Sequence, residues 1–374
     1  MQANNINKKR LAIFIPSLNG GGAERVMVTL ANNFAELGFS VDLVLARAEG
    51  PYLNEVSGKV NIVGLKIGRA WIVLVELIRY LRRAKPVVML AALGHANVLS
   101  ILARAISGVP TRLVVSERNN FSAGKVDARN LRERYMGFAM KWAYPRADGV
   151  IAVSGGVADD LAKAINLPRA KIDVVYNPVY TEKLRAQSLL VPDHPWLTHK
   201  EVPVILGMGR LAAQKDFSTL LRAFAVLRQT RDVRLIILGQ GPLHVQLLNL
   251  IAELGLKEVV DLPGFMRNPF AFLKHADLFV LSSRYEGLPN ALIQAMACGA
   301  PVVSTDCPSG PMEILENGKW GQLVPVGDVQ AMAKAMAFAL DDQNPPDVVA
   351  RASEFDVDTA VNGYLHVMLP EKQN

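Results

Sequence analysis

Residues 278–290 read LFVLSSRYEGLPN, a short apolar strand that ends in a polar loop. Residues 291–298 follow with the apolar spacing of a helix, and residues 299–303 return to strand-like sequence. A strand, a polar loop and a helix in succession form the repeating unit of a parallel sheet with helices on its faces.

The same unit recurs on both sides of this stretch. Near-continuous Val, Ile and Leu runs alternate with helical patterns and predict parallel sheets covered on both faces. These runs are residues 11–17, 41–46, 87–92, 111–116 and 149–153, then 204–209, 234–238, 259–261, 278–281 and 302–304.

The length of 374 residues favours two domains. Residues 179–202 combine prolines and charges without a clear period and predict a linker. We therefore expect an α/β protein with two doubly wound domains at residues 1–178 and 203–355, and a last helical segment at residues 356–374.

Composition narrows the class of partner. The net charge of +7 suits an anionic partner, and because no nucleic-acid-binding module is visible, phosphates and a membrane surface are the better candidates. No segment has the roughly 20 uncharged apolar residues of a membrane span. We expect no cleaved signal peptide. The two cysteines, Cys298 and Cys307, fit no disulfide framework or metal spacing, which indicates a reducing cytoplasm.

Two motifs follow strands at the edge where such sheets bind ligands. Residues 20–24, Gly-Gly-Gly-Ala-Glu, are a glycine turn before a helix and suit either an anion site or a flexible loop. Arg210 and Lys215 follow the first strand of the second domain and could bind one pyrophosphate, or could be solvated surface cations.

Glu286 and the helix behind it form the third motif. The carboxylate could accept hydrogen bonds from sugar hydroxyls, and the first amides of the helix could hold a phosphate. Gln294 lies about one turn into this helix. The alternative is a helix-start charge and a surface glutamine.

Taken together, these motifs resemble the signature of the retaining family 4 glycosyltransferases. The resemblance rests on residues 286–290 and 295–303, on Gly209-Arg210-Leu211 with Lys215, and on residues 20–25. It extends from about residue 10 to about residue 370, with the motifs in the family's order.

The resemblance implies the GT-B fold, in which two Rossmann-like domains face a cleft. The N-terminal domain would bind the acceptor, the C-terminal domain the nucleotide sugar, and the segment 356–374 would pack back on the N-terminal domain. Arg210 and Lys215 would neutralise the donor pyrophosphate and Glu286 would contact the sugar, as the catalytic residues. The other expected donor contacts are Gly209, Gly264, Phe265, Met266, Gly287, Leu288, Pro289, Asn290 and Gln294.

Two departures from the family pattern stand out. Gln294 replaces the family's second glutamate, which usually binds the ribose, so we expect weaker ribose binding. Where many relatives have a histidine, this chain has Glu117, Arg118 and Asn119, a variant associated with polyprenyl-linked glycans. The residues expected on the acceptor side are Gly20, Gly21, Gly22, Glu24, His95, Glu117, Arg118 and Asn119, although a lone histidine such as His95 is more often structural.

The expected chemistry needs no metal and no cofactor. Cations and helix amides would stabilise the leaving diphosphate, and the acceptor would attack from the same face, with retention. The only Asp-x-Asp sequence, residues 356–358, is typical of a helix N-cap cluster.

These features predict transfer of a hexose or N-acetylhexosamine from a nucleotide sugar, expected to be UDP-linked, to a polyprenyl-diphosphate-linked or other glycan in bacterial polysaccharide synthesis. A transferase with a soluble acceptor and a non-catalytic nucleotide-sugar-binding subunit are the alternatives. Only a transferase that acts on a lipid-linked acceptor requires lipid. A non-catalytic subunit would bind UDP without transferring the sugar.

A membrane surface is a further expected partner. An apolar stretch, residues 71–81, ends among Arg79, Arg82, Arg83 and Lys85, and aromatic residues at 135, 138 and 142 lie among Lys125, Arg129, Arg132, Arg134 and Lys141. Basic amphipathic helices with aromatics bind anionic leaflets, although a core-facing helix with a solvated basic face gives the same pattern. We therefore expect a cytoplasmic protein that is peripheral on the inner membrane.

Overall fold

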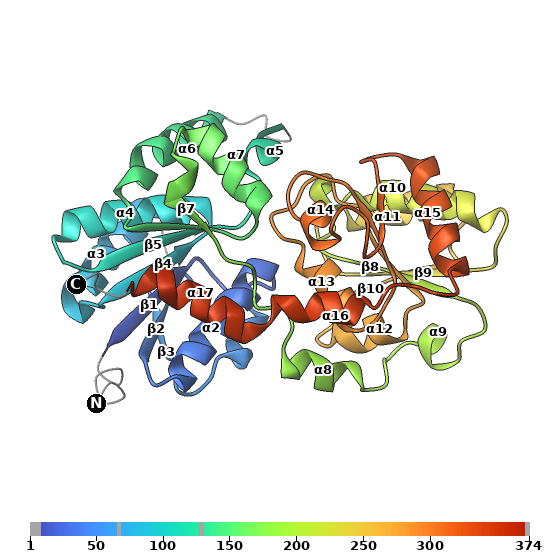
Figure 1. The fold of residues 1–374 in the computed structure, drawn as a ribbon, viewed down its shortest axis with the longest axis horizontal. Coiled ribbons are helices and arrows are strands. Elements are labelled where there is room, and N and C mark those ends of the chain that lie inside the picture. The colour runs from blue at the N-terminus through green and yellow to red at the C-terminus, as the bar shows by residue number, and fades with distance from the viewer. Residues whose placement is uncertain (1–8, 66–68, 127–130, 371–374) are drawn as a thin grey trace. The chain divides into compact units, whose positions relative to one another are not determined.

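The computed structural model describes residues 9–65, 69–126 and 131–370. The chain forms two compact units (Figure 1). Unit 1 combines Met1–Pro178 with Asp358–Asn374, and unit 2 is Val179–Val357.

Unit 1 contains a seven-stranded parallel sheet in the order β3-β2-β1-β4-β5-β6-β7. The inner strands are Leu-, Val- and Ala-rich and almost wholly buried, as a sheet covered on both faces requires. The strands are β1 (Arg10–Ile15), β2 (Ser40–Leu45), β3 (Asn61–Gly64), β4 (Val88–Ala92), β5 (Arg112–Glu117), β6 (Gly149–Ala152) and β7 (Ile172–Val174).

The helices of unit 1 come from both ends of the chain. They are α2 (Gly22–Glu36), α3 (Ala70–Ala84), α4 (Gly94–Ser107), α5 (Phe121–Val126), α6 (Leu131–Ala143), α7 (Gly155–Ile165) and α17 (Val357–Met368), with 3₁₀ turns η1 (Pro51–Glu55), η2 (Tyr144–Arg146) and η3 (Arg169–Lys171). Two glycines bring α17 close to its neighbours. A Cβ on Gly149 would lie 2.9 Å from Val367 Cγ1, and one on Gly363 would lie 2.9 Å from Val175 Cγ1.

Unit 2 contains a six-stranded parallel sheet in the order β10-β9-β8-β11-β12-β13. Its strands are β8 (Val204–Met208), β9 (Arg234–Leu238), β10 (Val260–Gly264), β11 (Leu278–Leu281), β12 (Val302–Thr305) and β13 (Gln322–Val324). The prediction of an α/β protein with two parallel sheets is confirmed. The sequence pattern did not predict the short edge strands β3, β7 and β13, because strands of three or four residues show no clear hydrophobic alternation.

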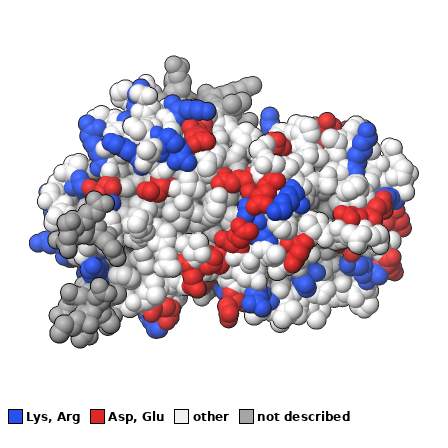
Figure 2. Space-filling view, in the orientation of Figure 1, with Lys and Arg blue, Asp and Glu red and all other residues white. Residues whose placement is uncertain are grey.

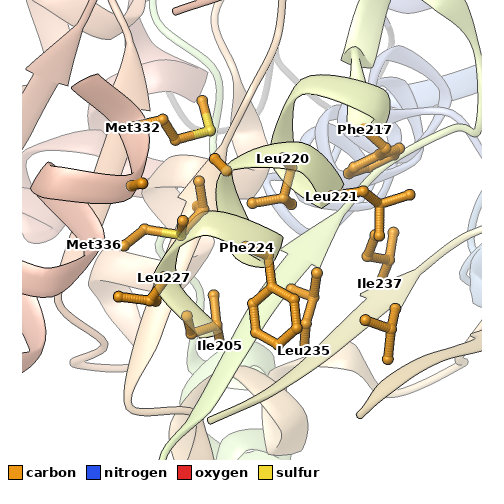
Figure 3. Packing of buried hydrophobic residues seen from close by; sticks show 14 of the residues in the cluster. Ile205, Phe217, Leu220, Leu221, Phe224, Leu227, Leu235, Ile237, Met332 and Met336 are labelled. Atoms are coloured by element: carbon orange, nitrogen blue, oxygen red, sulfur yellow. The ribbon is translucent and has the colours of Figure 1, made fainter. Parts of the chain in front are cut away.

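The helices of unit 2 cover this sheet. They are α8 (Glu182–Ser188), α9 (Pro195–Thr198), α10 (Phe217–Arg228), α11 (His244–Glu253), α12 (Pro269–His275), α13 (Asn290–Ala297), α14 (Pro311–Ile314), α15 (Val329–Asp341) and α16 (Val348–Ala352), with η4 (Ala213–Lys215) and η5 (Ser353–Phe355). One core lies between α10, α15 and the sheet, where Phe224 of α10 lies over the strands that carry Ile205, Leu235 and Ile237 (Figure 3).

The segment 179–202, expected as a linker, carries α8 and α9 and belongs to unit 2. It is tied down by side chains: the His194 ring contacts Asp261 Oδ2 through Nε2 at 2.9 Å, and Asn268 Nδ2 donates to Gln187 O at 2.9 Å. Helices of seven and four residues are too short to show a hydrophobic period, which is why the pattern suggested a linker.

Phe224 is fully buried, so Phe224→Ala should lower the free energy of unfolding by about 3–5 kcal/mol through lost burial and the cavity left behind. Urea denaturation followed by far-UV circular dichroism measures this loss. The matched control is Phe338→Ala, because Phe338 of α15 is 58% exposed and its loss should change stability by no more than about 0.5 kcal/mol. Equal effects of the two changes would contradict the described core.

Candidate functional site

The carboxyl ends of β8 and β11, which are neighbours in unit 2, bring Lys215 and Glu286 together. Lys215 Nζ forms an ion pair with Glu286 Oε1, and Ser283 Oγ donates to the same oxygen at 2.6 Å. The Glu286 side chain is only 7% exposed and that of Lys215 17%. Both of these contacts are made to Oε1 of the Glu286 carboxylate.

Hydrogen bonds fasten the two loops to each other beneath this ion pair. Ser282 Oγ donates to Lys215 O at 2.7 Å, and Gln214 Nε2 donates to Tyr285 O at 2.9 Å. The backbone N–H of Arg284 donates to Gln214 O at 2.8 Å. The position of Lys215 relative to Glu286 is therefore fixed by backbone as well as by charge.

Two glycines make room for this arrangement. A Cβ on Gly209 would lie 3.1 Å from Lys215 Cε, so glycine leaves space for the lysine stem. Gly310 has φ 99°, and a Cβ there would lie 2.5 Å from Pro289 Cδ. The loop before α14 therefore packs directly against the turn that follows Glu286.

That turn leads into α13. Gly287, Leu288 and Pro289 are buried, and the Glu286 N–H donates to Pro308 O at 3.1 Å. Pro289 is the N-cap residue of α13, and its side chain makes no capping hydrogen bond to the first amides of the helix. A helix N-terminus of this kind attracts anions through its amides and dipole.

The remaining residues expected on the donor side lie at the same edge of the sheet. Arg210 is exposed directly after Gly209, and Gln294 is half-buried in α13. Gly264 ends β10 with φ 90° and accepts the Gly239 N–H at 2.8 Å. Phe265, next along the chain, is 37% exposed, and Met266 is half-buried.

Ser283 and Gln214 hold this site together, and sequence reasoning did not single them out. Ser283 lies in residues 278–290. Two consecutive serines between an apolar strand and a glutamate could have indicated a side chain that binds Glu286. Gln214 carried no signal, because its role depends on a loop 71 residues away in the chain.

Cys307 lies behind Glu286. Burial and the Glu286 charge raise the pKa of the Cys307 thiol to about 12, and burial likewise raises the pKa of Cys298 to about 12. Both thiols are therefore neutral at physiological pH, and neither is suited to act as a nucleophile.

In unit 1 the glycine turn is shaped by Glu24. Gly21 is the N-cap of α2, and a Cβ there would lie 2.2 Å from Glu24 Oε2, so a larger residue would displace this carboxylate. Gly20 has φ 95° and its carbonyl accepts the Tyr52 hydroxyl at 3.2 Å. The first residue of α2 is Gly22, so Glu24 is its third residue, a position that often reaches back to the cap.

Glu117 ends β5 and is almost fully buried. Its Oε2 accepts the Tyr144 hydroxyl at 2.8 Å, its Oε1 accepts the Arg118 N–H at 3.2 Å, and Asn97 Nδ2 donates to Tyr144 Oη at 2.9 Å. Burial raises the pKa of Glu117, and the hydrogen bonds from Tyr144 and from the backbone of Arg118 oppose the rise.

The other residues expected on the acceptor side differ in exposure. His95, the second residue of α4, and Asn119 are exposed, whereas the Arg118 guanidinium is buried and bonded to Tyr364 and Asn177. These residues and the glycine turn follow β1, β4 and β5, which are neighbours in the sheet. Arg118 is thus occupied by protein partners rather than open to a ligand.

Two features are absent from the residues that the structure describes. Within residues 9–65, 69–126 and 131–370, no group of three His, Cys, Asp or Glu side chains could hold a metal ion. In the same part of the chain no helix has the length and apolarity needed to cross a membrane.

Alkylation tests the burial of the two thiols. In the folded protein at pH 8, iodoacetamide should label Cys298 and Cys307 very slowly, since a pKa of about 12 leaves on the order of one thiol in ten thousand ionised. Mass spectrometry of the native and the urea-unfolded chain gives the comparison. Rapid labelling of either cysteine in the folded protein would show that its surroundings are not as described.

The chain is similar to known glycosyltransferases in both halves of its sequence. The family model described as Glycosyltransferase Family 4 matches residues 20–183, and the one described as Glycosyl transferases group 1 matches residues 193–354. The chain is 32% identical over 342 residues to the N-acetylgalactosamine-N,N'-diacetylbacillosaminyl-diphospho-undecaprenol 4-alpha-N-acetylgalactosaminyltransferase of Campylobacter jejuni, an alignment that covers 89% of this chain and 91% of the relative.

Two further similarities are more distant. The lipopolysaccharide core biosynthesis glycosyltransferase LpsE of Rhizobium meliloti is 27% identical, over 87% of each chain. The fold is shared with the structure of Anabaena Alr3699/HepE in complex with UDP and glucose, with a TM-score of 0.77, 21% identity, and coverage of 95% of this chain and 97% of that one.

Proposed function

This chain belongs to glycosyltransferase family 4, and we propose that it transfers a hexose or N-acetylhexosamine from a UDP-sugar to a glycan carried on polyprenyl diphosphate, in the synthesis of a bacterial surface glycan. It is a glycosyltransferase with the GT-B fold. The observation that carries the donor half of the proposal is the Lys215–Glu286 pair at the start of α13.

The donor would bind at the carboxyl edge of unit 2. Lys215 and Arg210 would neutralise the diphosphate, and the first amides of α13 would face the same charge. Oε2 of Glu286 would accept hydrogen bonds from sugar hydroxyls while Ser283 and Lys215 hold Oε1. Phe265 and Met266 would lie beside the base. The UDP in the Alr3699/HepE structure supports a uridine nucleotide.

As sugar–phosphate cleavage proceeds, negative charge grows on the diphosphate and the cations stabilise it. We propose same-face attack with retention, in which the leaving phosphate takes the acceptor proton. No metal is assigned to this step, so activity is expected to persist in EDTA.

The acceptor half of the proposal rests on the Campylobacter relative, whose name specifies a diphospho-undecaprenol substrate. Unit 1 offers Asn119 and His95 as exposed polar side chains after β5 and β4, and Glu117 as a buried carboxylate beside them. A lipid-linked substrate would also require contact with a membrane surface.

Unit 1 carries a surface suited to such contact. On α6, Tyr135, Phe138 and Trp142 share one face and are 71%, 75% and 45% exposed, and Arg146 lies over the Trp142 ring at 4.1 Å. Figure 2 shows Lys and Arg gathered over the region where Figure 1 places α4 and α6. Arg129 and the side chains of Lys125, Arg132 and Arg134 lie outside the described residues. We propose that this surface docks on the anionic inner leaflet.

Transfer of radiolabel from a panel of UDP- and GDP-sugars into bacterial lipid extract tests the function. We expect incorporation from one UDP-sugar that EDTA does not abolish, and a product with the donor's anomeric configuration by NMR. Transfer only to a water-soluble acceptor would contradict the lipid-linked acceptor, and loss of transfer in EDTA would contradict the metal-free mechanism. A requirement for a GDP-sugar would contradict the proposed base.

The Gln294→Glu change should strengthen UDP binding about tenfold, because a carboxylate binds ribose hydroxyls more strongly than an amide does. Isothermal titration calorimetry with UDP gives the affinity, and Gln294→Ala, which should bind UDP more weakly than the wild type, is the paired variant. If Gln294→Glu binds UDP no better, Gln294 does not face the ribose.

For the membrane surface, Phe138→Ser should weaken binding to vesicles that contain anionic lipid by about tenfold or more, since one large apolar side chain no longer inserts. Vesicle sedimentation at low salt measures the partition coefficient. Phe338→Ser is the control, because Phe338 is also exposed but lies on α15 of unit 2. Equal loss in both variants, or no binding by the wild type, would count against this surface.

A further inference from the structure

Arg118 differs from the other residues expected to meet the acceptor, because its guanidinium is enclosed by the protein. We infer that Arg118 is a positioning residue: Tyr364 of α17 and Asn177 hold it, and through it α17 fixes the loop at residues 117–120 that presents Asn119 to the acceptor. This inference rests on the proposed function, since it takes the carboxyl edge of unit 1 as the acceptor side.

The contacts of Arg118 are short and buried. Its Nη1 donates to Tyr364 Oη at 2.8 Å, and its Nη2 donates to Asn177 Oδ1 at 2.8 Å. Ser116 Oγ lies 3.5 Å from Nη1. Arg118 is 6% exposed, Asn177 3% and Tyr364 0%. Burying a guanidinium is costly unless it makes such hydrogen bonds. The position of the loop therefore depends on the positions of Tyr364 and Asn177.

The partners come from distant parts of the chain. Asn177 is the second-last residue of the first segment of unit 1, and Tyr364 lies in the segment that returns to that unit after residue 357. The separation between Arg118 and Tyr364 is 246 residues. The loop after β5 is therefore held in part by a helix whose Tyr364 lies 246 residues further along the chain.

Other hydrogen bonds hold the rest of this loop, in which Asn119 is the exposed residue. Glu117 accepts the Tyr144 hydroxyl, and Asn120 Oδ1 accepts the Ala123 N–H at 2.8 Å at the start of α5. Glu117, Arg118 and Asn120 are each less than 9% exposed, whereas Asn119 between them is exposed. The three buried side chains hold the backbone on both sides of Asn119, so the position from which its exposed amide extends is fixed.

The same strand provides a matched control. Arg112, at the other end of β5, also binds α17: its Nε and Nη2 donate to Val367 O at 3.3 and 3.2 Å, and Nη2 donates to Asp148 O at 3.0 Å. A change at Arg112 loosens α17 without touching the loop at residues 117–120. Arg112 therefore separates general bracing of the helix from positioning of the loop.

Steady-state kinetics of Arg118→Lys, Tyr364→Phe and Arg112→Lys test the inference with the lipid-linked acceptor and the UDP-sugar. Arg118→Lys and Tyr364→Phe should raise the acceptor KM about tenfold and leave the donor KM within about twofold, as expected when a buried hydrogen bond that positions one substrate is lost. Arg112→Lys should lower the melting temperature but leave the acceptor KM unchanged. An equal rise of the acceptor KM in all three variants, or no rise in the first two, would overturn the inference.

Hydrogen–deuterium exchange gives a readout that does not depend on the acceptor. The amides of residues 117–120 should exchange faster in Arg118→Lys and Tyr364→Phe than in the wild type and in Arg112→Lys. Unchanged exchange in this loop would refute the clamp. If the wild type transfers sugar only to a soluble acceptor, the proposed acceptor class is wrong, and the same KM comparison with that acceptor still decides the role of Arg118.

Discussion

Lys215 and Glu286 stand 71 residues apart in the chain and form an almost buried ion pair at the carboxyl edge of the sheet of unit 2. Removing two charges from water is costly, and a pair of this kind persists only when its geometry is fixed and further hydrogen bonds complete it. Ser283 supplies such a bond to Glu286, and the bonds of Gln214 and Ser282 fix the geometry by joining the two loops. The strands β8 and β11 must therefore be neighbours for the site to exist at all.

The chemistry follows from the asymmetry of this pair. Lys215 and Ser283 both contact Oε1 of Glu286, and the turn that opens α13 follows Glu286 directly in the chain. In the proposed function a nucleotide sugar would supply two kinds of group: phosphate for the lysine, Arg210 and the helix amides, and hydroxyls for the carboxylate. On donor binding the site would then exchange an internal ion pair for one shared with the diphosphate, so that little new charge would be buried.

Much of this could be predicted from the sequence, because parallel strands end at one edge of a sheet and polar residues directly after them meet there. Lys215 and Glu286 were candidates for that reason, and the resemblance to family 4 then implied their roles. The alternation of apolar runs with helical patterns predicted the two-sheet α/β fold. Side-chain direction could not be predicted. Arg118 follows a strand like the others, yet its guanidinium turns inward to Tyr364, a partner 246 residues away. Glu24 likewise folds over Gly21, so the glycine turn fits a carboxylate of the same chain.

Binding of UDP to Lys215→Met, measured by isothermal titration calorimetry, examines whether the buried pair is a diphosphate site. We expect about a hundredfold weaker binding than in the wild type, the effect of losing a charge-assisted contact to a phosphate. Lys319→Met, which removes an exposed lysine paired with Glu316 in the same unit, should bind UDP as the wild type does. Unchanged UDP affinity in a folded Lys215→Met protein would contradict the assignment of this pair to the donor.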